Sequence, residues 1–299
     1  MPGSIAQGKI GGVMALGVNI TFRLLEFADL TVDGSIATGA AVSVMLIRAG
    51  VSPIATLPIA FLAGALAGMV TGLLNTALGI PGILASILTQ ISLYSINLNI
   101  MGKANQPVSV DNYPLVVSLR YVTDGSVSRL LFFLGMIVFL LALIAVMYWY
   151  FGTEQGHAIR ATGCNSNMAR AQGINTNFIK VLALMISNGL VGLCGALYGQ
   201  FQGASDVNMG RGAIVIGLAA VIIGEVLFGK FASKRKLAFA FTLASVILGA
   251  VIYYMVYQFV LWLKMPSEDM KLFSAIVVAI FLAIPYLKEK RTLRKGASK

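Results

Sequence analysis

The chain has 299 residues, of which 58% are hydrophobic and only 11% are charged, and its mean hydropathy is +0.87. Since a soluble domain carries about 25% charged residues, this composition excludes a water-soluble protein and predicts an integral membrane protein. The net charge of +11 does not indicate nucleic-acid binding, because the basic residues lie at the ends of apolar runs rather than on one face with interleaved aromatics. Two cysteines and one histidine predict neither a disulfide framework nor a metal site, and we expect no cofactor.

Segments of about 20 apolar residues are needed to cross a bilayer. The sequence contains such segments at about 5–25, 35–50, 54–75, 82–101, 129–151, 179–202, 213–229, 237–263 and 272–287. They predict an all-α polytopic bundle of about nine transmembrane helices, forming a single domain over 1–299. The second and last segments are short, so the count could be eight or ten.

Lysine and arginine predict the orientation of these helices. Basic clusters occur in the loop 152–180, in the short loop 230–236 and in the tail 288–299. Two predicted spans separate each pair of neighbouring clusters, so all three fall on one side, which is the cytoplasm by the positive-inside rule. This arrangement predicts a multi-pass protein of the cell membrane, with the N-terminus and 102–128 outside and the C-terminus inside.

The segment 22–35 places four charged residues, Arg23, Glu26, Asp29 and Asp33, between two apolar runs. A charge at the bilayer centre costs about 2.5–3.5 kcal/mol on insertion scales. We therefore expect these residues at the inner edge of the membrane or along a wet cavity. One interpretation is a broken helix on a translocation path that includes Asp29 and Asp33; the other is an ordinary charged turn.

Polar residues also recur at helical spacing in the segment 82–101, where Gln90, Tyr94 and Asn97 share one face. This face would suit the lining of a pore. It would equally suit hydrogen bonds between helices, which are worth about 0.6 kcal/mol each.

The loop 153–175 is the longest polar stretch on the predicted cytoplasmic side. It contains a candidate short helix at about 165–172, with Asn165 as the N-cap and Gly173 as the stop. A compact helix of this kind could be a docking knob for a cytoplasmic partner or a plain connecting loop. Two glycine ridges, 64–68–72 and 195–199–203, indicate either close helix packing or a weak inverted repeat.

Three stretches together resemble the permeases of ATP-binding-cassette importers, in the branch that includes branched-chain amino acid and ribose permeases: FADLTVDGSIATGAA, IPGILASILTQISLYSINLNIMG and RATGCNSNMARAQGIN. Within that branch, FADLTVDGS is most similar to the tryptophan/tyrosine transport permeases. The resemblance implies a type II importer fold, with two permease subunits as a homodimer or pseudo-dimer, a separate ATPase subunit inside and a substrate-binding protein outside. It also implies a coupling loop at about 152–178, in which the residues received by the ATPase are Arg160, Gly163, Ala169, Gln172 and Gly173.

On this resemblance we expect a transport subunit that is not an enzyme and that takes up an aromatic amino acid. Branched-chain amino acids, sugars or nucleosides are the alternative substrates. An ion-coupled secondary transporter is a rival class, but it usually keeps a buried acid within a span, and no predicted span has one clearly at mid-depth. An intramembrane enzyme would need convergent catalytic groups, which one histidine and scattered carboxylates do not supply.

Overall fold

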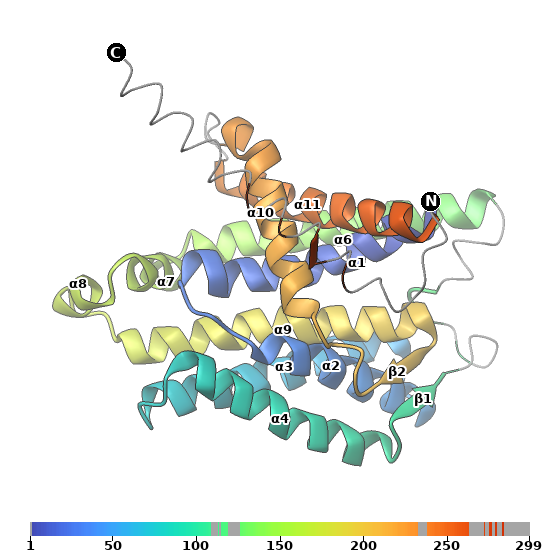
Figure 1. Ribbon diagram of the computed structural model, residues 1–299, viewed down its shortest axis with the longest axis horizontal. Helices are drawn as coiled ribbons and strands as arrows, with labels where there is room; N and C mark the ends of the chain where they lie inside the picture. Colours follow the sequence, from blue (N-terminus) through green and yellow to red (C-terminus); the bar gives the residue numbers. More distant parts are fainter. Residues whose placement is uncertain are drawn as a thin grey trace.

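The computed structural model describes residues 2–108, 113, 115–118, 126–232 and 238–262, together with residues 272, 275, 276, 279 and 283. These residues form an elongated bundle of helices with one small two-stranded sheet (Figure 1). The predicted all-α polytopic architecture is confirmed. The predicted last span, 272–287, lies outside the described residues apart from those isolated positions.

Eight of the nine predicted spans are helical. The membrane-length elements are α1 (Pro2–Asn19) continued by the π-helical turn η1 (Ile20–Leu24), α2 (Thr31–Arg48), α3 (Pro53–Thr76), α4 (Gly82–Met101), α6 (Ser126–Phe151), α9 (Thr176–Gln202), α10 (Ala213–Ala232) and α11 (Ala238–Trp262). Two further helices, α7 (Glu154–Cys164) and α8 (Ser166–Ala171), lie between α6 and α9.

Within the described residues, five helices are long and apolar enough to cross a membrane: α3, α4, α6, α9 and α11. The apolar part of α10, Ala213–Phe228, is shorter. The remaining two, α1 and α2, have 18 residues each and are mostly buried among the other helices. A helix enclosed by protein can carry Gly, Ser and Thr for packing, which explains why these two are less apolar than a lipid-facing helix.

The bundle is built around α9, which contacts α1, α2 and α3 along its length. Figure 1 shows α1 on one side of α9 and α2 and α3 on the other. Glycines allow this close approach: a Cβ on Gly64 or Gly68 would overlap the carbonyl oxygen of Asn188 or Leu184, and a Cβ on Gly195 would overlap that of Ile36. Both predicted glycine ridges therefore serve backbone-to-backbone packing.

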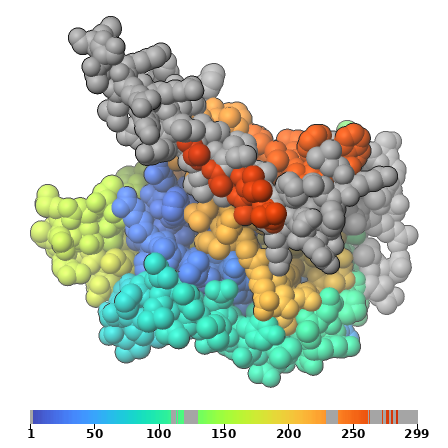
Figure 2. All heavy atoms as spheres, viewed as in Figure 1, coloured from blue at the N-terminus to red at the C-terminus, as the bar shows by residue number. Residues whose placement is uncertain are grey.

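The two ends of the bundle differ in structure. At one end, strands β1 (Asn105–Pro107) and β2 (Ala204–Asp206) pair antiparallel, with Asn105 opposite Asp206. At the other end, α7 and α8 project from the bundle (Figure 1), and Figure 2 shows them as a separate lobe of the surface. The segments 105–107 and 204–206, which are predicted to lie outside the cell, and the loop 153–175, which is predicted to lie inside, are thus at opposite ends of the molecule.

The predicted helix at 165–172 is present as α8. The Asn165 side chain accepts hydrogen bonds from the backbone N–H groups of Asn167 and Met168 at 3.1 and 3.0 Å, and Gly173 follows the helix with a φ of +83°. An asparagine N-cap and a left-handed glycine are what a helix of six residues needs to begin and end sharply. The preceding helix α7, capped by Thr153, was not predicted from the sequence.

Candidate functional site

The predicted break between the first two spans is a real interruption of the helix. After α1 the chain forms the π-helical turn η1, then runs without regular structure through residues 25–30, where Glu26 has a φ of +53°. A new helix begins at Thr31, whose backbone N–H donates to Asp29 Oδ1 at 3.0 Å. A π-helical turn before an irregular segment is typical of functional sites in helices.

Asn188 of α9 holds this break in place. Its Nδ2 donates to Asp29 Oδ2 at 2.6 Å and to the Leu184 carbonyl oxygen at 3.1 Å, while its Oδ1 accepts a hydrogen bond from Ser35 Oγ at 2.6 Å. One amide therefore connects the segment before α2 to Ser35, near the start of α2. In the sequence, Asn188 is simply a polar residue inside an apolar segment. The structure shows that it bonds to both the irregular segment and α2.

Asp29 is only 2% exposed and pairs with the thirteenth of the 27 residues of α9. Asp29 belongs to the irregular segment between η1 and α2 and not to a helical span, although it lies beside the middle of α9. The carboxylate is tolerated because it accepts hydrogen bonds from Thr31 and Asn188, as a buried polar group requires. Asp29 therefore stabilises the interruption between η1 and α2 and does not line an open path.

Asp33 connects α2 to the start of α10. Its Oδ2 accepts from the Gly212 N–H and its Oδ1 accepts from the Ile214 N–H, each at 2.9 Å. A Cβ on Gly210 would overlap the Asp33 carbonyl oxygen, so the two chain segments touch. A carboxylate at a helix N-terminus satisfies free N–H groups and is favoured by the helix dipole. The N-terminal ends of two helices consequently meet at Asp33.

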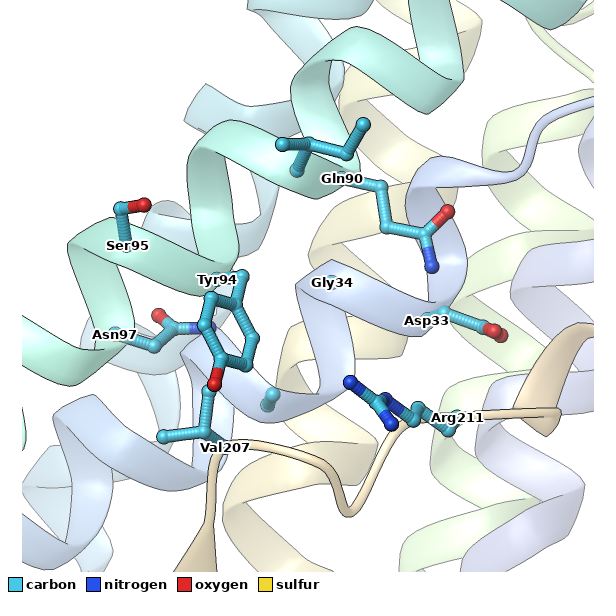
Figure 3. A pocket seen from close by; sticks show the side chains of 10 residues that line it. Asp33, Gly34, Gln90, Tyr94, Ser95, Asn97, Val207 and Arg211 are labelled. Atoms are coloured by element: carbon cyan, nitrogen blue, oxygen red, sulfur yellow. The ribbon is translucent and has the colours of Figure 1, made fainter. Parts of the chain in front are cut away.

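A cavity of about 360 Å3 opens beside this meeting point, between α2, α4 and the segment that leads into α10. It is lined by Asp33, Gly34, Ala37, Gln90, Ile91, Tyr94, Ser95, Asn97, Val207 and Arg211 (Figure 3). The structure therefore brings together four of the five residues predicted for the path: Asp33, Gln90, Tyr94 and Asn97. The fifth, Asp29, does not line the cavity.

The polar face of α4 is turned toward this cavity. Asn97 is 1% exposed, and neither of its amide atoms has a hydrogen-bond partner in the described part of the chain. Tyr94, by contrast, is 43% exposed. An unsatisfied buried amide costs about 1–3 kcal/mol, so Asn97 is positioned for a partner that enters the cavity.

Arg211 is the charged lining residue that was not predicted from the sequence. It lies in the turn between β2 and α10, and Figure 3 shows its guanidinium directed into the space between Asp33 and Tyr94. A signal was present in the sequence, because Arg211 is the only basic residue between Lys180 and Lys230 and it stands between two glycines.

The five residues predicted for coupling divide into two groups. Gly163 faces the helix bundle, where a Cβ would overlap the Leu24 carbonyl oxygen at the end of η1, and Ala169 is the buried residue of α8. Gln172 and Gly173 are exposed beyond the end of α8. The first group is thus buried at or near the junction of the lobe and the bundle, and the second is accessible on the surface of the lobe.

Arg160 of α7 belongs to the group that faces the bundle. Its guanidinium carbon lies 4.1 Å from the centroid of the Phe239 ring and 5.7 Å from that of Phe151, which are cation–π distances. Burial lowers the pKa of Arg160 from its ordinary value. These contacts attach α7 to the ends of α6 and α11.

The bundle, the interrupted helix and the cavity between helix ends define a polytopic membrane transport protein. The sequence model of the "Branched-chain amino acid transport system / permease component" family matches residues 2–285. This chain belongs to that family, whose members are permeases of ATP-binding-cassette transport systems.

Two of three similar proteins are permeases. The chain is 39% identical to the tyrosine transport system permease protein of Clostridioides difficile (strain R20291) over 279 residues, which is 93% of this chain and 89% of that one. It is 31% identical over 284 residues to the uncharacterized protein RP368 of Rickettsia prowazekii (strain Madrid E), covering 94% and 95% of the two chains. It is 27% identical over 218 residues to the inner membrane ABC transporter permease protein YjfF of Escherichia coli (strain K12), covering 72% and 64%. No solved structure matches the chain.

Proposed function

We propose that this chain is the permease subunit of an importer that takes up an aromatic amino acid, with tyrosine as the first candidate. The observation that carries the proposal is the cavity at the break between η1 and α2, where Asp33, Gln90, Tyr94 and Asn97 converge. The tyrosine permease that is 39% identical over nearly the whole chain supports the choice of substrate. Branched-chain amino acids, sugars or nucleosides are the alternatives.

The mechanism is alternating access without covalent chemistry in this chain. ATP hydrolysis takes place in a separate cytoplasmic ATPase that docks on α8, where the Met168 side chain is 64% exposed and Gln172 and Gly173 are accessible. Movement of α7 and α8 is then passed to η1 through the contact between Gly163 and Leu24. The helices around the cavity open alternately to the two sides of the membrane.

The opposite end of the bundle receives the substrate from an external binding protein. The sheet of β1 and β2 lies there and ties the segment after α4 to the segment after α9. Large apolar side chains are exposed along α3, α4 and α6, as expected for surfaces that meet lipid or a second permease subunit. The working unit is a homodimer or pseudo-dimer in the cell membrane, with the C-terminus in the cytoplasm.

An ion-coupled carrier is the second candidate, and the buried Asp29 is the observation that favours it. Against it, Asp29 is bonded to Asn188 and Thr31 and does not line the cavity. Membership of a family of ATP-binding-cassette permeases also opposes this candidate.

Reconstitution tests the proposal directly. The permease, its ATPase and the cognate binding protein are placed in proteoliposomes, and tyrosine uptake and ATPase stimulation are measured with ATP and with a non-hydrolysable analogue. We expect uptake that requires hydrolysis. Stimulation by ribose or a nucleoside but not by tyrosine or tryptophan would contradict the substrate. Uptake driven by an ion gradient without ATP would contradict the importer itself.

A matched pair of glycine variants tests the docking surface. Gly173 and Gly50 both have a positive φ, +83° and +91°, and a Cβ would meet nothing within 4 Å at either position. They lie at opposite ends of the bundle, so Gly173→Glu and Gly50→Glu impose similar backbone strain at different surfaces. We expect only Gly173→Glu to abolish ATPase-driven uptake. Equal effects of the two variants would refute docking at α8.

A further inference from the structure

The charges of the cavity are arranged so that Arg211 is left free. The Asp33 carboxylate accepts the N–H groups of Gly212 and Ile214, and it forms no ion pair with Arg211. Within the described residues, the Arg211 side chain makes neither a hydrogen bond nor an ion pair. Figure 3 shows its guanidinium pointing into the open space of the cavity rather than at the Asp33 oxygens.

A free guanidinium in a cavity is suited to one kind of ligand group. Its planar fork of N–H donors matches a carboxylate through two parallel hydrogen bonds, and Arg is always protonated. Next to it, the Asp33 oxygens retain lone pairs beyond the two backbone bonds that they accept, so they can receive an ammonium group. Arg211 and Asp33 are the two charged residues among those that line the cavity. A negative and a positive group on the ligand would balance both.

Asn97 adds a second and independent feature. It is 1% exposed, lines the same cavity, and has both its amide oxygen and its amide nitrogen unpartnered among the described residues. Figure 3 shows Asn97 near Tyr94, on the side of the cavity away from Asp33. A hydroxyl group is the smallest ligand group that can satisfy both atoms, because it donates one hydrogen bond and accepts others. An ammonium group, which only donates, would leave the Asn97 amide nitrogen without an acceptor, and an apolar ring edge would leave the whole amide unsatisfied.

We infer that the cavity is a two-ended site for a zwitterionic amino acid with a hydroxyl on its side chain, in which Arg211 binds the carboxylate and Asn97 binds the hydroxyl. The inference rests on the proposed function and narrows its substrate class. The cavity volume of about 360 Å3 lies in the range of small-molecule sites. The ring of Tyr94, which lies between the two ends in Figure 3, offers an aromatic surface to the middle of such a ligand.

Variants of Arg211 test the carboxylate end. The complete permease–ATPase complex with its binding protein is reconstituted carrying Arg211→Gln, Arg211→Lys or the control Lys103→Gln, which removes an exposed charge just after α4. We expect tyrosine uptake to fall about 30-fold or more in Arg211→Gln, since truncating a hydrogen-bonded charge pair has an effect of that size. Arg211→Lys should keep part of the activity and Lys103→Gln nearly all of it. Thermal midpoints and basal ATPase rates show whether each variant is folded.

Ligand competition tests both ends without relying on the binding protein. Saturation-transfer NMR measures tyrosine bound to the purified permease–ATPase complex, with tyramine, which lacks the carboxylate, and phenylalanine, which lacks the hydroxyl, as competitors. We expect both to compete at least tenfold more weakly than tyrosine, and Asn97→Leu to abolish the preference for tyrosine over phenylalanine.

Several results would overturn the inference. One is an Arg211→Gln complex that binds and transports tyrosine within twofold of the unaltered complex, and another is tyramine competing as well as tyrosine. The absence of any tyrosine signal from the unaltered complex would also overturn it, while ATP-dependent tyrosine uptake by that complex would leave the proposed function standing. Failure of tyrosine uptake in every preparation would instead refute the proposed function.

Discussion

Replacement of Asn188 by leucine is the sharpest test of how the break before α2 is held. The substitution keeps a similar volume but removes the donor to Asp29 and the acceptor for Ser35, both at 2.6 Å. A hydrogen bond to a charged group contributes about 1.5–3 kcal/mol and a neutral one about 0.5–1.5 kcal/mol. We therefore expect a loss of roughly 2–4 kcal/mol in the free energy of unfolding, and a thermal midpoint lower by roughly 3–6 °C, because the entropy of unfolding scales with chain length.

The assay is thermal unfolding of the purified permease in detergent, followed by tyrosine uptake after reconstitution. Asn99→Leu is the control, because Asn99 is exposed on α4 and the same atoms are exchanged there. In the double variant Asp29→Leu/Asn188→Leu both partners are apolar, so its loss should be smaller than the sum of the single losses by about 1 kcal/mol or more. A midpoint for Asn188→Leu within 2 °C of the unaltered protein, or strict additivity in the double variant, would refute the stabilising role of the Asn188 hydrogen bonds.

Two further predictions concern the lobe of α7 and α8 and the orientation of the chain. Gly163→Val should reduce uptake at least tenfold while ATP hydrolysis continues, because the valine side chain would displace η1. Gly135→Val in α6 is the control and should be neutral, since the space around Gly135 is open. Equal effects of the two variants would exclude the α7–η1 contact from coupling. In a Cys164→Ser background, Lys103→Cys should react with a membrane-impermeant thiol reagent in intact cells and Met168→Cys only after lysis. The reverse labelling pattern would show that the orientation of the chain in the membrane is opposite to the predicted one.

The convergence of two separate sequence signals on one cavity shows what local pattern can predict. The helical spacing of Gln90, Tyr94 and Asn97 defined one polar face of α4, and the charges of 22–35 marked a break; the structure places Asp33 from that break opposite that face. Both signals are local, since a helical repeat and a run of charges between apolar segments can be counted along the chain. The same holds for α8, whose cap and stop are a single asparagine and a single glycine.

Features that depend on distant partners could not be predicted in this way. Whether Asp29 faces solvent or is buried depends on Asn188, which is 159 positions further along the chain, and no local pattern links the two. Arg211 was not identified from the sequence, because its place in the cavity is set by the packing of Gly210 onto α2. Helix α7 was missed since its glycines, Gly156 and Gly163, are unfavourable for a helix but are needed for its contacts with neighbouring backbone.

A continuous series of contacts joins the exposed tip of α8 to the cavity. Gly163 of α7 touches the Leu24 carbonyl at the end of η1. The chain then runs through the irregular segment to Asp29, which Asn188 connects to α2. In α2, Asp33 caps the N-terminus of α10. Spatial continuity alone does not establish coupling, which requires an element with two arrangements that both ends bias. The π-helical turn η1 and the irregular backbone after it are the candidate for such an element, because a change in their dihedral angles would break no regular helix. If η1 is that element, Gly163→Val separates ATP hydrolysis from uptake, whereas Asn188→Leu weakens the fold and the transport step together.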